Sequence, residues 1–202
     1  MSTLGAQVFG NAQAAAAVAE LQELLRQAPI PLGQQTFIGL TQTLPRLMAN
    51  GWTALAQHPA ELARRRAEPQ LMGRAVEELM RYAPIIQMVS RRAMADVDLA
   101  GERVAEGGQV NLMLAVANRD PEHFRDPEAL DVSRREGNQL ALGIGRDSCA
   151  GAVAVRMIYA AATAALLEAF AEIEPAGPVE WRQRSVFRWP AALPVTCVSA
   201  GS

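Results

Sequence analysis

Apolar and polar positions recur at a helical period through the first half of the chain. This pattern predicts helices over residues 12–27, 33–58, 59–67 and 70–82. Prolines follow or begin several of these segments, as expected of a residue that lacks an amide hydrogen and so does not continue a helix. The helix over 33–58 contains Pro45 internally, and we expect it to be disturbed near that residue.

The alternation typical of strands is confined to the second half. Residues 96–114 alternate as two short strands around Gly101, and the tail from Trp181 onward predicts short strands joined by turns. Residues 117–142 are rich in Asp, Arg, Pro and Asn and predict a loop. Residues 151–170 predict a long alanine-rich helix. The predicted fold class is therefore mainly α with a small β region.

Composition limits the classes of protein that need to be considered. The 202 residues suffice for one domain with a sizeable core, and 19 basic against 21 acidic residues give a net charge of −2. This balance does not support binding to nucleic acid or to a membrane surface. The apolar run over 157–167 is too short to span a bilayer, and no secretory signal is visible. Two cysteines make no disulfide framework, so we expect a cytoplasmic protein.

One of the two cysteines lies in an unusual stretch, "GIGRDSCAG", over residues 143–151. Gly143 and Gly145 permit positive φ and a close approach of the backbone to a ligand. Cys149 falls at the start of the following predicted helix, where the helix dipole and free N–H groups stabilise a thiolate. A thiolate in such a loop suits a soft or borderline metal, above all iron.

Other interpretations of Cys149 are possible from this loop alone. A structural zinc site would need further ligands, and no CxxC pair or nearby histidine supplies them. A catalytic nucleophile would need a base, but His58 and His123 are distant in sequence. The glycines do not have the spacing of a dinucleotide-binding loop. A buried, inert cysteine stays open as an alternative.

Further motifs distinguish between these interpretations. Glu78 and Arg81 form an ExxR pair, followed in order by "VSRRA", "ANRDPEHFRDPEALDVSR" and "LGIGRDSCAG". With these motifs, the sequence resembles the haem-binding half of a bacterial-type cytochrome P-450, a haem-thiolate monooxygenase. The resemblance covers residues 33–194. It implies a truncated cytochrome P-450-like fold. We expect residues 1–202 to form a single haem-binding domain, in which residues 1–32 are an N-terminal helix and linker.

The resemblance assigns roles residue by residue. Cys149 matches the cysteine whose thiolate is the axial ligand of the iron in haem b. Glu78, Arg81 and Arg134 match a structural charge cluster, in which two arginines share one carboxylate. Arg91 matches the arginine that pairs with a haem propionate. Its neighbour in the "VSRRA" motif is a rival, because alternation in an extended segment would point that side chain the other way.

The cysteine loop departs from the family pattern at two positions. Leu142 replaces the usual phenylalanine seven residues before the cysteine, and Asp147 replaces a basic residue two before it. An acid at that place would repel a propionate unless Arg146 takes over the contact. The cofactor-binding residues implied by the resemblance are Cys149, Arg91, Arg146, Gly143 and Gly145.

The distal side is represented by "GLTQT", residues 39–43. In this register Thr43 matches the oxygen-side threonine of the family, and Gln42 replaces the acid that normally relays protons. Leu40 replaces a glycine that leaves room for dioxygen. A register shifted by one residue is an alternative.

By resemblance, the chain is a monooxygenase that takes electrons from a ferredoxin- or flavin-type donor and inserts one oxygen atom from dioxygen into a small organic substrate. Family domains are about twice as long, so this chain is a fragment, one part of a split enzyme or a natural short form. A second chain or self-association could cover its distal face. The alternatives are a non-catalytic haem-binding protein or partner subunit, and a peroxide-dependent haem enzyme.

Two smaller features have ordinary explanations. The run Arg64-Arg65-Arg66 is typical of a solvated helix face, with a docking surface for an acidic electron donor as the alternative. Cys197, near the end of the chain, is interpreted as a passive thiol.

Overall fold

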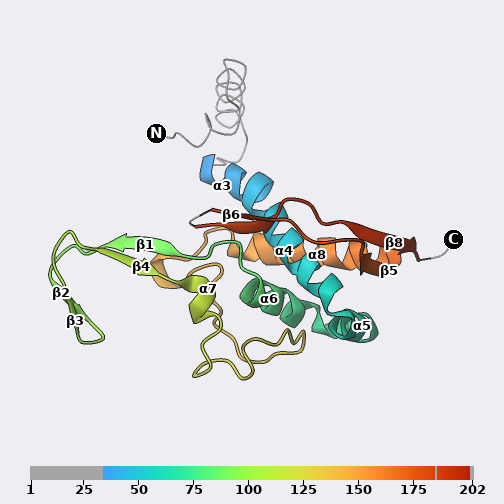
Figure 1. Cartoon of the computed structure of the whole chain (residues 1–202), viewed down its shortest axis with the longest axis horizontal. Coiled ribbons are helices and arrows are strands. Elements are labelled where there is room, and N and C mark those ends of the chain that lie inside the picture. The colour runs from blue at the N-terminus through green and yellow to red at the C-terminus, as the bar shows by residue number, and fades with distance from the viewer. Residues whose placement is uncertain (1–33, 185, 201–202) are drawn as a thin grey trace, which may run out of the picture. The chain divides into compact units, whose positions relative to one another are not determined.

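The structure, a computed structural model, describes residues 34–184 and 186–200 (Figure 1). The helix predicted over 12–27 and the linker expected up to residue 32 lie outside these residues. The chain divides into two units, with the boundary between Thr43 and Leu44, and each unit is described by itself.

The described part of the first unit is helical but not uniformly α-helical. Helix α3 covers Gln34–Ile38 and passes into a π-helical segment, η1, over Gly39–Thr43. Within it, the Thr41 hydroxyl donates a hydrogen bond of 2.8 Å to the carbonyl of Phe37. The disturbance expected near Pro45 therefore falls just ahead of the proline. Proline offers no amide hydrogen to the helix, so the preceding turn is a natural place for a departure from α geometry.

The second unit is built on three helices that pack on one another: α4 (Leu44–Gln57), α6 (Met72–Tyr82) and α8 (Ala152–Ala169). Helix α5 (Pro59–Ala67) and the 3-10 turn η2 (Pro69–Leu71) connect α4 to α6. The predicted helical segments thus form in this unit, each with an apolar face turned inward. Its core is made of side chains that these three helices bury together, among them Leu47, Leu55, Val76, Leu79, Met80 and Tyr159.

Two antiparallel strand pairs follow α6. Strand β1 (Val89–Arg92) pairs with β4 (Gln109–Leu112), and between them β2 (Val97–Leu99) pairs with β3 (Glu102–Val104). The β2–β3 turn contains Gly101 at φ +87°, a conformation that glycine adopts readily. The two strands predicted around Gly101 are confirmed, and Figure 1 shows them at the far end of an arm that β1 and β4 begin.

The C-terminal part adds two more antiparallel pairs. Strand β5 (Phe170–Pro175) follows α8 directly and pairs with β8 (Val195–Ser199). Strand β6 (Trp181–Gln183) pairs with β7 (Arg188–Pro190). The short strands predicted for the tail are confirmed, whereas β5 was not predicted. The mainly α fold with a small β region is also confirmed.

The segment predicted as a loop over 117–142 is irregular, yet part of it is buried. A short helix, α7 (Leu114–Ala117), leads into it. Phe124, Leu130 and Val132 then contribute side chains that are at most 5% exposed. Buried backbone groups without a regular ladder need other hydrogen-bond partners. The charged side chains of the candidate site supply several of them, as described below.

Helix α8 is longer than the apolar run over 157–167, whose length predicted that it does not span a membrane. Over Ala152–Ala169 it is long and apolar enough to cross a membrane, judged by length and composition only. Every fourth residue from Val155 to Leu167 is buried in the core of the second unit. This pattern is that of a core helix, which passes the same test of length and composition.

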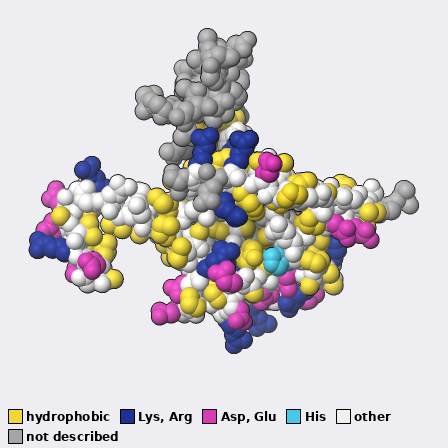
Figure 2. All heavy atoms as spheres, viewed as in Figure 1, with side chains coloured by type: hydrophobic (Ala, Val, Ile, Leu, Met, Phe, Trp, Pro, Cys, Tyr) yellow, Lys and Arg dark blue, Asp and Glu magenta, His cyan; other side chains and the backbone are white. Residues whose placement is uncertain are grey.

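Charges of both signs are interspersed on the face shown in Figure 2, rather than gathered into a basic or acidic patch. In the β2–β3 hairpin, for example, Arg103 pairs with Asp96 at 2.6 Å.

Candidate functional site

The cysteine loop ends at the start of α8, and local hydrogen bonds fix its course. The amide of Cys149 donates to the carbonyl of Leu142 at 2.7 Å, and the amide of Ala152 donates to the carbonyl of Cys149 at 3.0 Å. Between Leu142 and Cys149, residues Gly145–Asp147 form a 3-10 turn, η3. Cys149 itself is a free, exposed cysteine. The buried cysteine that the sequence left open is therefore excluded.

Both glycines of the loop have backbone conformations that other residues rarely adopt. Gly143 has φ +71° and Gly145 has φ +66°. A Cβ atom at Gly143 would also lie 2.9 Å from the carbonyl oxygen of Asp147, which is closer than real Cβ atoms approach. The loop is thus drawn tightly around its own backbone at Gly143, where a side chain would clash. At Gly145 a side chain would be opposed only by the positive φ.

The described residues offer a metal few donors at this site. Among residues 34–184 and 186–200, no group of three His, Cys, Asp or Glu side chains could hold a metal ion together. A structural zinc site of the usual kind needs four protein ligands. A metal bound by Cys149 would have to bring its other donors with it, as iron in a porphyrin does.

Arg91 faces the cysteine loop from strand β1. Its Nη2 atom lies 3.4 Å from Oδ2 of Asp147, and its Nη1 atom donates to the carbonyl of Ser90 at 3.0 Å. The neighbouring side chain of Arg92 instead donates from Nε to the carbonyl of Gly107 at 3.1 Å. The two adjacent arginines therefore have different partners, and only Arg91 has an ion pair with the loop.

Arg146 also belongs to the cysteine loop. It is exposed within the 3-10 turn, and no ion pair or hydrogen bond of its side chain is found in the part of the chain that the structure describes. Arg91 thus contributes one guanidinium group from β1, and Arg146 contributes another from the loop. Only the Arg91 guanidinium is paired with Asp147.

A buried carboxylate on α6 is shared by two arginines. In α6, Nε and Nη2 of Arg81 donate to the two carboxylate oxygens of Glu78 at 2.7 and 2.8 Å. Nε of Arg134 donates to Oε2 of the same carboxylate at 3.0 Å. The side chains are 1%, 1% and 5% exposed for Arg81, Glu78 and Arg134. Fork-shaped contacts of this kind are stronger than single hydrogen bonds.

The two arginines also satisfy buried carbonyls of the irregular segment. Arg81 donates to the carbonyl of Asn118 at 2.8 Å, and Arg134 donates to the carbonyl of Ala129 at 3.2 Å. The Glu78 carboxylate in turn accepts from the amide of Asp131 at 2.9 Å. The remaining carbonyl acceptors are those of Pro127 and Ala129 for Arg81, and of Arg125 and Asp126 for Arg134.

Glu77 is a site residue that the sequence reasoning missed. Its Oε1 atom accepts a hydrogen bond of 2.5 Å from Nε of Arg156 in α8, and its Oε2 atom accepts one of 3.0 Å from Gln139. The bond to Glu77 raises the pKa of Arg156 against the effect of burial, and the nearby Cys149 side chain adds to the rise. Glu77 directly precedes Glu78 in "EELMR", so the doubled acid was the available signal.

Asn118 was also missed, although it belongs to the "ANRDP" motif. Its side chain is fully buried, and its Oδ1 atom accepts a hydrogen bond of 2.7 Å from the amide of Leu140. Because its own carbonyl binds Arg81, this residue connects the buried charge cluster to the chain that leads into the cysteine loop.

The distal candidates lie in the first unit. Gln42 and Thr43 are the last two residues of the π-helical segment η1. Such segments are frequent at functional sites, because the extra residue per turn redirects nearby side chains.

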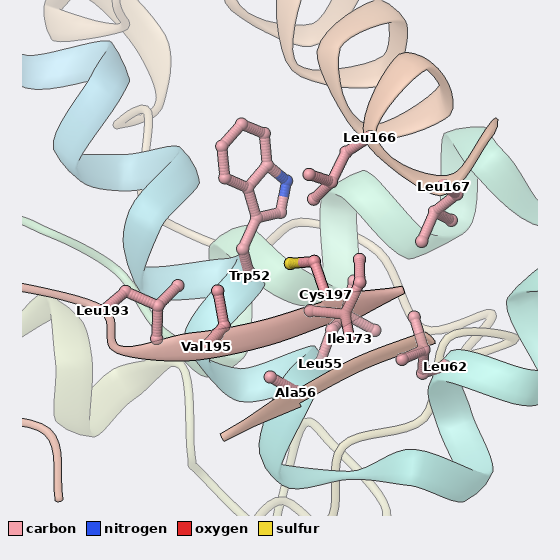
Figure 3. A pocket seen from close by; sticks show the side chains of 10 residues that line it. All are labelled: Trp52, Leu55, Ala56, Leu62, Leu166, Leu167, Ile173, Leu193, Val195 and Cys197. Atoms are coloured by element: carbon pink, nitrogen blue, oxygen red, sulfur yellow. The ribbon is translucent and has the colours of Figure 1, made fainter. Parts of the chain in front are cut away.

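The second cysteine is also exposed, but it lies in another part of the fold. Cys197 on β8 lines an apolar cavity of about 130 Å³ between α4, α5, the end of α8 and β5. Figure 3 shows its sulfur on the side of the cavity where Trp52 and Leu166 lie. Cys149 precedes α8, whereas Leu166 belongs to its last turn, so the two thiols are at opposite ends of a helix about 27 Å long.

The three arginines in α5 do not form one solvated face. Arg64 is exposed and pairs with Glu68 and Asp131. Arg65 is buried, and burial lowers the pKa of its guanidinium. Arg66 donates two hydrogen bonds to carbonyls near the end of α8. The interpretation of this run as a solvated face is therefore wrong for two of its three members.

Comparison with known proteins identifies the family. The Cytochrome P450 family profile matches residues 55–185, which is more than half of the chain. The biotin biosynthesis cytochrome P450 of Bacillus subtilis is 38% identical over 157 residues, which cover 77% of this chain and 40% of that protein. The cytochrome P450 CYP199A2 of Rhodopseudomonas palustris is 34% identical over 174 residues, covering 86% and 42%.

Solved structures give the same answer for the fold. P450BioI in complex with an acyl carrier protein ligated to hexadec-9Z-enoic acid superimposes with a TM-score of 0.81 at 32% identity, over 98% of this chain and 57% of that one. The tirandamycin C-bound P450 monooxygenase TamI gives a TM-score of 0.81 at 29% identity, over 90% and 54%. The chain belongs to the cytochrome P450 family, and membership implies a haem cofactor. It spans about two-fifths of the length of these curated relatives.

Proposed function

We propose that this chain is the haem-binding portion of a monooxygenase, with the thiolate of Cys149 as the axial ligand of haem b. The observation that carries the proposal is the exposed cysteine, held in a tight glycine loop at the start of α8, in a chain of this family. The residues around it fit a porphyrin. They offer one soft donor, an exposed approach and cations for the propionates.

In this proposal, Arg91 and Arg146 hold the propionates of the haem, one from β1 and the other from the loop itself. Gly143 and Gly145 keep side chains away from the porphyrin, so the backbone approaches it closely. Glu78, Arg81 and Arg134 act at a distance: they hold the irregular segment that delivers the loop, and they touch neither cofactor nor substrate.

We assign the distal roles to Thr43 and Gln42. The threonine hydroxyl donates and accepts hydrogen bonds, so it can hold a water molecule or an oxygen ligand. The glutamine amide also does both, but it does not titrate near neutral pH and therefore transfers no proton as an acid would.

The bound haem supplies the oxygen chemistry: one atom of dioxygen enters a small organic substrate, and the other leaves as water with two electrons and two protons. A ferredoxin- or flavin-type donor provides the electrons. The cytoplasm, where such donors and reduced thiols coexist, is the compartment that we assign.

In this proposal, self-association or a second chain covers apolar surface that this chain leaves exposed. The exposed face of α8 carries Val153, Met157 and Ile158, which are 72%, 67% and 41% exposed. Apolar side chains grouped in this way are typical of surfaces that another segment covers. Light scattering on dilute purified protein should therefore report a dimer or a larger species. A monomer that holds haem tightly would contradict this part of the proposal.

The cofactor assignment is tested with the two cysteines. The haem-loaded protein should give the red-shifted absorption of a thiolate ligand when it is reduced and exposed to carbon monoxide. Cys149→Ala should abolish this band, whereas Cys197→Ala should leave it intact, because the second thiol lies at the far end of α8. Loss of the band in the Cys197 variant, or its survival in the Cys149 variant, would show that the assignment is wrong.

A further inference from the structure

The contact between β1 and the cysteine loop is an ion pair within the protein. Nη2 of Arg91 lies 3.4 Å from Oδ2 of Asp147, and the two side chains are 46% and 54% exposed. Asp147 is two residues from Cys149. The Asp147 carboxylate therefore binds the same Arg91 guanidinium that the proposed function assigns to a haem propionate.

The backbone on both sides of this pair is fixed. Arg91 pairs with Val110 in the β1–β4 ladder, so the position of its Cα atom is set by the sheet. On the loop, the amide of Ser148 donates to the carbonyl of Gly145 at 3.1 Å, and the amide of Cys149 donates to the carbonyl of Leu142 at 2.7 Å. The Asp147 carboxylate consequently stays near Arg91 unless its side chain rotates away.

We infer that Asp147 weakens the hold of Arg91 on an ionised propionate, so that this site binds haem less tightly than it would without the acid. The inference rests on the proposed function. A propionate that approaches Arg91 meets a carboxylate already in place, so it must displace that group or share the guanidinium with it. Two like charges at one cation repel each other, which weakens binding of the charged ligand. A porphyrin with neutral side chains does not experience this repulsion.

The size of the effect follows from exposure. Ion pairs at exposed positions contribute little, and salt screens them. Removal of the Asp147 charge should therefore tighten haem binding by about three- to tenfold at low salt, and by less at high salt.

The test is a titration of the full chain with haem and with the dimethyl ester of haem, in one detergent-containing buffer. Binding is followed by the growth of the haem absorption band and by quenching of tryptophan fluorescence. Asp147→Asn should bind haem about three- to tenfold more tightly than the unmodified protein. Asp147→Arg should bind it more tightly still. Neither variant should change the affinity for the ester.

Asp96→Asn is the matched control, because Asp96 pairs with Arg103 at 2.6 Å in the exposed β2–β3 hairpin. This variant should change neither the affinity for haem nor the affinity for its dimethyl ester.

Three results would overturn the inference. Unchanged haem affinity in Asp147→Asn would show that the charge does not matter. Weaker binding would mean that Asp147 positions Arg91 for the propionate. An equal gain for the ester would show that the effect is not one of charge. In each of these cases the wild-type titration still tests the proposed function separately. If neither porphyrin binds any variant, the proposed function fails and the inference fails with it.

Discussion

Arg134 and Arg81 share one carboxylate oxygen: Nε of Arg134 is 3.0 Å, and Nε of Arg81 is 2.7 Å, from the same Oε2 atom of Glu78. Arg134 follows α6 by many residues in sequence, so this contact closes the irregular segment back onto the helix. The carboxylate therefore anchors the part of this segment around Asp131 and Arg134 to α6.

Removal of the Glu78 charge should destabilise the protein strongly. Glu78→Gln would leave two buried guanidinium groups with carbonyl partners but without their counter-ion. Loss of one partner of a buried ion pair costs about 3–5 kcal/mol of unfolding free energy. Chemical denaturation followed by circular dichroism measures this loss.

Glu77→Gln is the matched control, one residue away. The Glu77 side chain is 41% exposed and pairs with Arg156, so its loss should cost less than about 1 kcal/mol. Equal stability losses in the two variants would contradict the special role of the buried carboxylate.

The sequence predicted the members of this cluster better than it predicted their environment. Glu78 and Arg81 are spaced to meet on one helix, and resemblance added Arg134. The residues between 117 and 142 were predicted as loop from their polar composition, and the absence of regular elements was correct for most of them. Their burial was not predictable from the sequence. It requires hydrogen-bond donors for the carbonyls of this segment, and Arg81 of the distant helix α6 supplies several of them.

Ion pairs and hydrogen bonds between distant elements were likewise not predictable from the sequence. The acid at Asp147 was recognised as a departure that would repel a propionate, but its contact with Arg91 requires β1 and the cysteine loop to be neighbours in space. The arginine run was misread for the same reason, since the partners of Arg66 lie at the end of α8.

Arg66 should stabilise the end of α8. Its two Nη atoms donate hydrogen bonds of 2.6 Å to the carbonyls of Leu167 and Phe170, where the helix leaves acceptors without intrahelical partners. Hydrogen bonds to charged groups contribute about 1.5–3 kcal/mol, so Arg66→Met should lower the free energy of unfolding by an amount in this range.

Arg64→Met tests whether the position matters rather than the charge. Arg64 is 44% exposed and makes two surface ion pairs, whose loss should cost less than about 1 kcal/mol. Denaturant titrations of both variants compare the two directly. A larger loss for Arg64 would show that the contacts with α8 are not the stabilising ones.

Gln42 should limit turnover that depends on protons. If Gln42→Glu restores an acid at the distal position, the reductase-driven oxidation of a dye should speed up more than the peroxide-driven oxidation, because peroxide already carries two electrons and two protons. Free haem gives the background for both assays. An equal response of the two rates would show that this residue does not limit proton delivery.

Gly51 should tolerate no side chain while Tyr159 keeps its hydroxyl. A Cβ atom at Gly51 would lie 1.7 Å from the Tyr159 oxygen and 3.0 Å from Cβ of Leu79. Gly51→Ala should therefore cost about 1–3 kcal/mol, although alanine favours a helix interior. Gly73→Ala is the control, because nothing lies within 4 Å of its added Cβ atom, and it should stabilise α6 by up to about 1 kcal/mol.

A double variant tests whether the Tyr159 hydroxyl causes the stability loss expected of Gly51→Ala. It is fully buried, and no hydrogen-bond partner for it is found within residues 34–184 and 186–200, so burial raises the pKa of the phenol. Tyr159→Phe alone should change stability little, because it removes an unsatisfied polar atom. In that background Gly51→Ala should cost less than in the unmodified chain, though not nothing, since the ring carbon Cζ would still lie 3.0 Å away. Equal costs in both backgrounds, measured by denaturant titration, would show that the clash is with Leu79 and the Tyr159 ring and not with the hydroxyl.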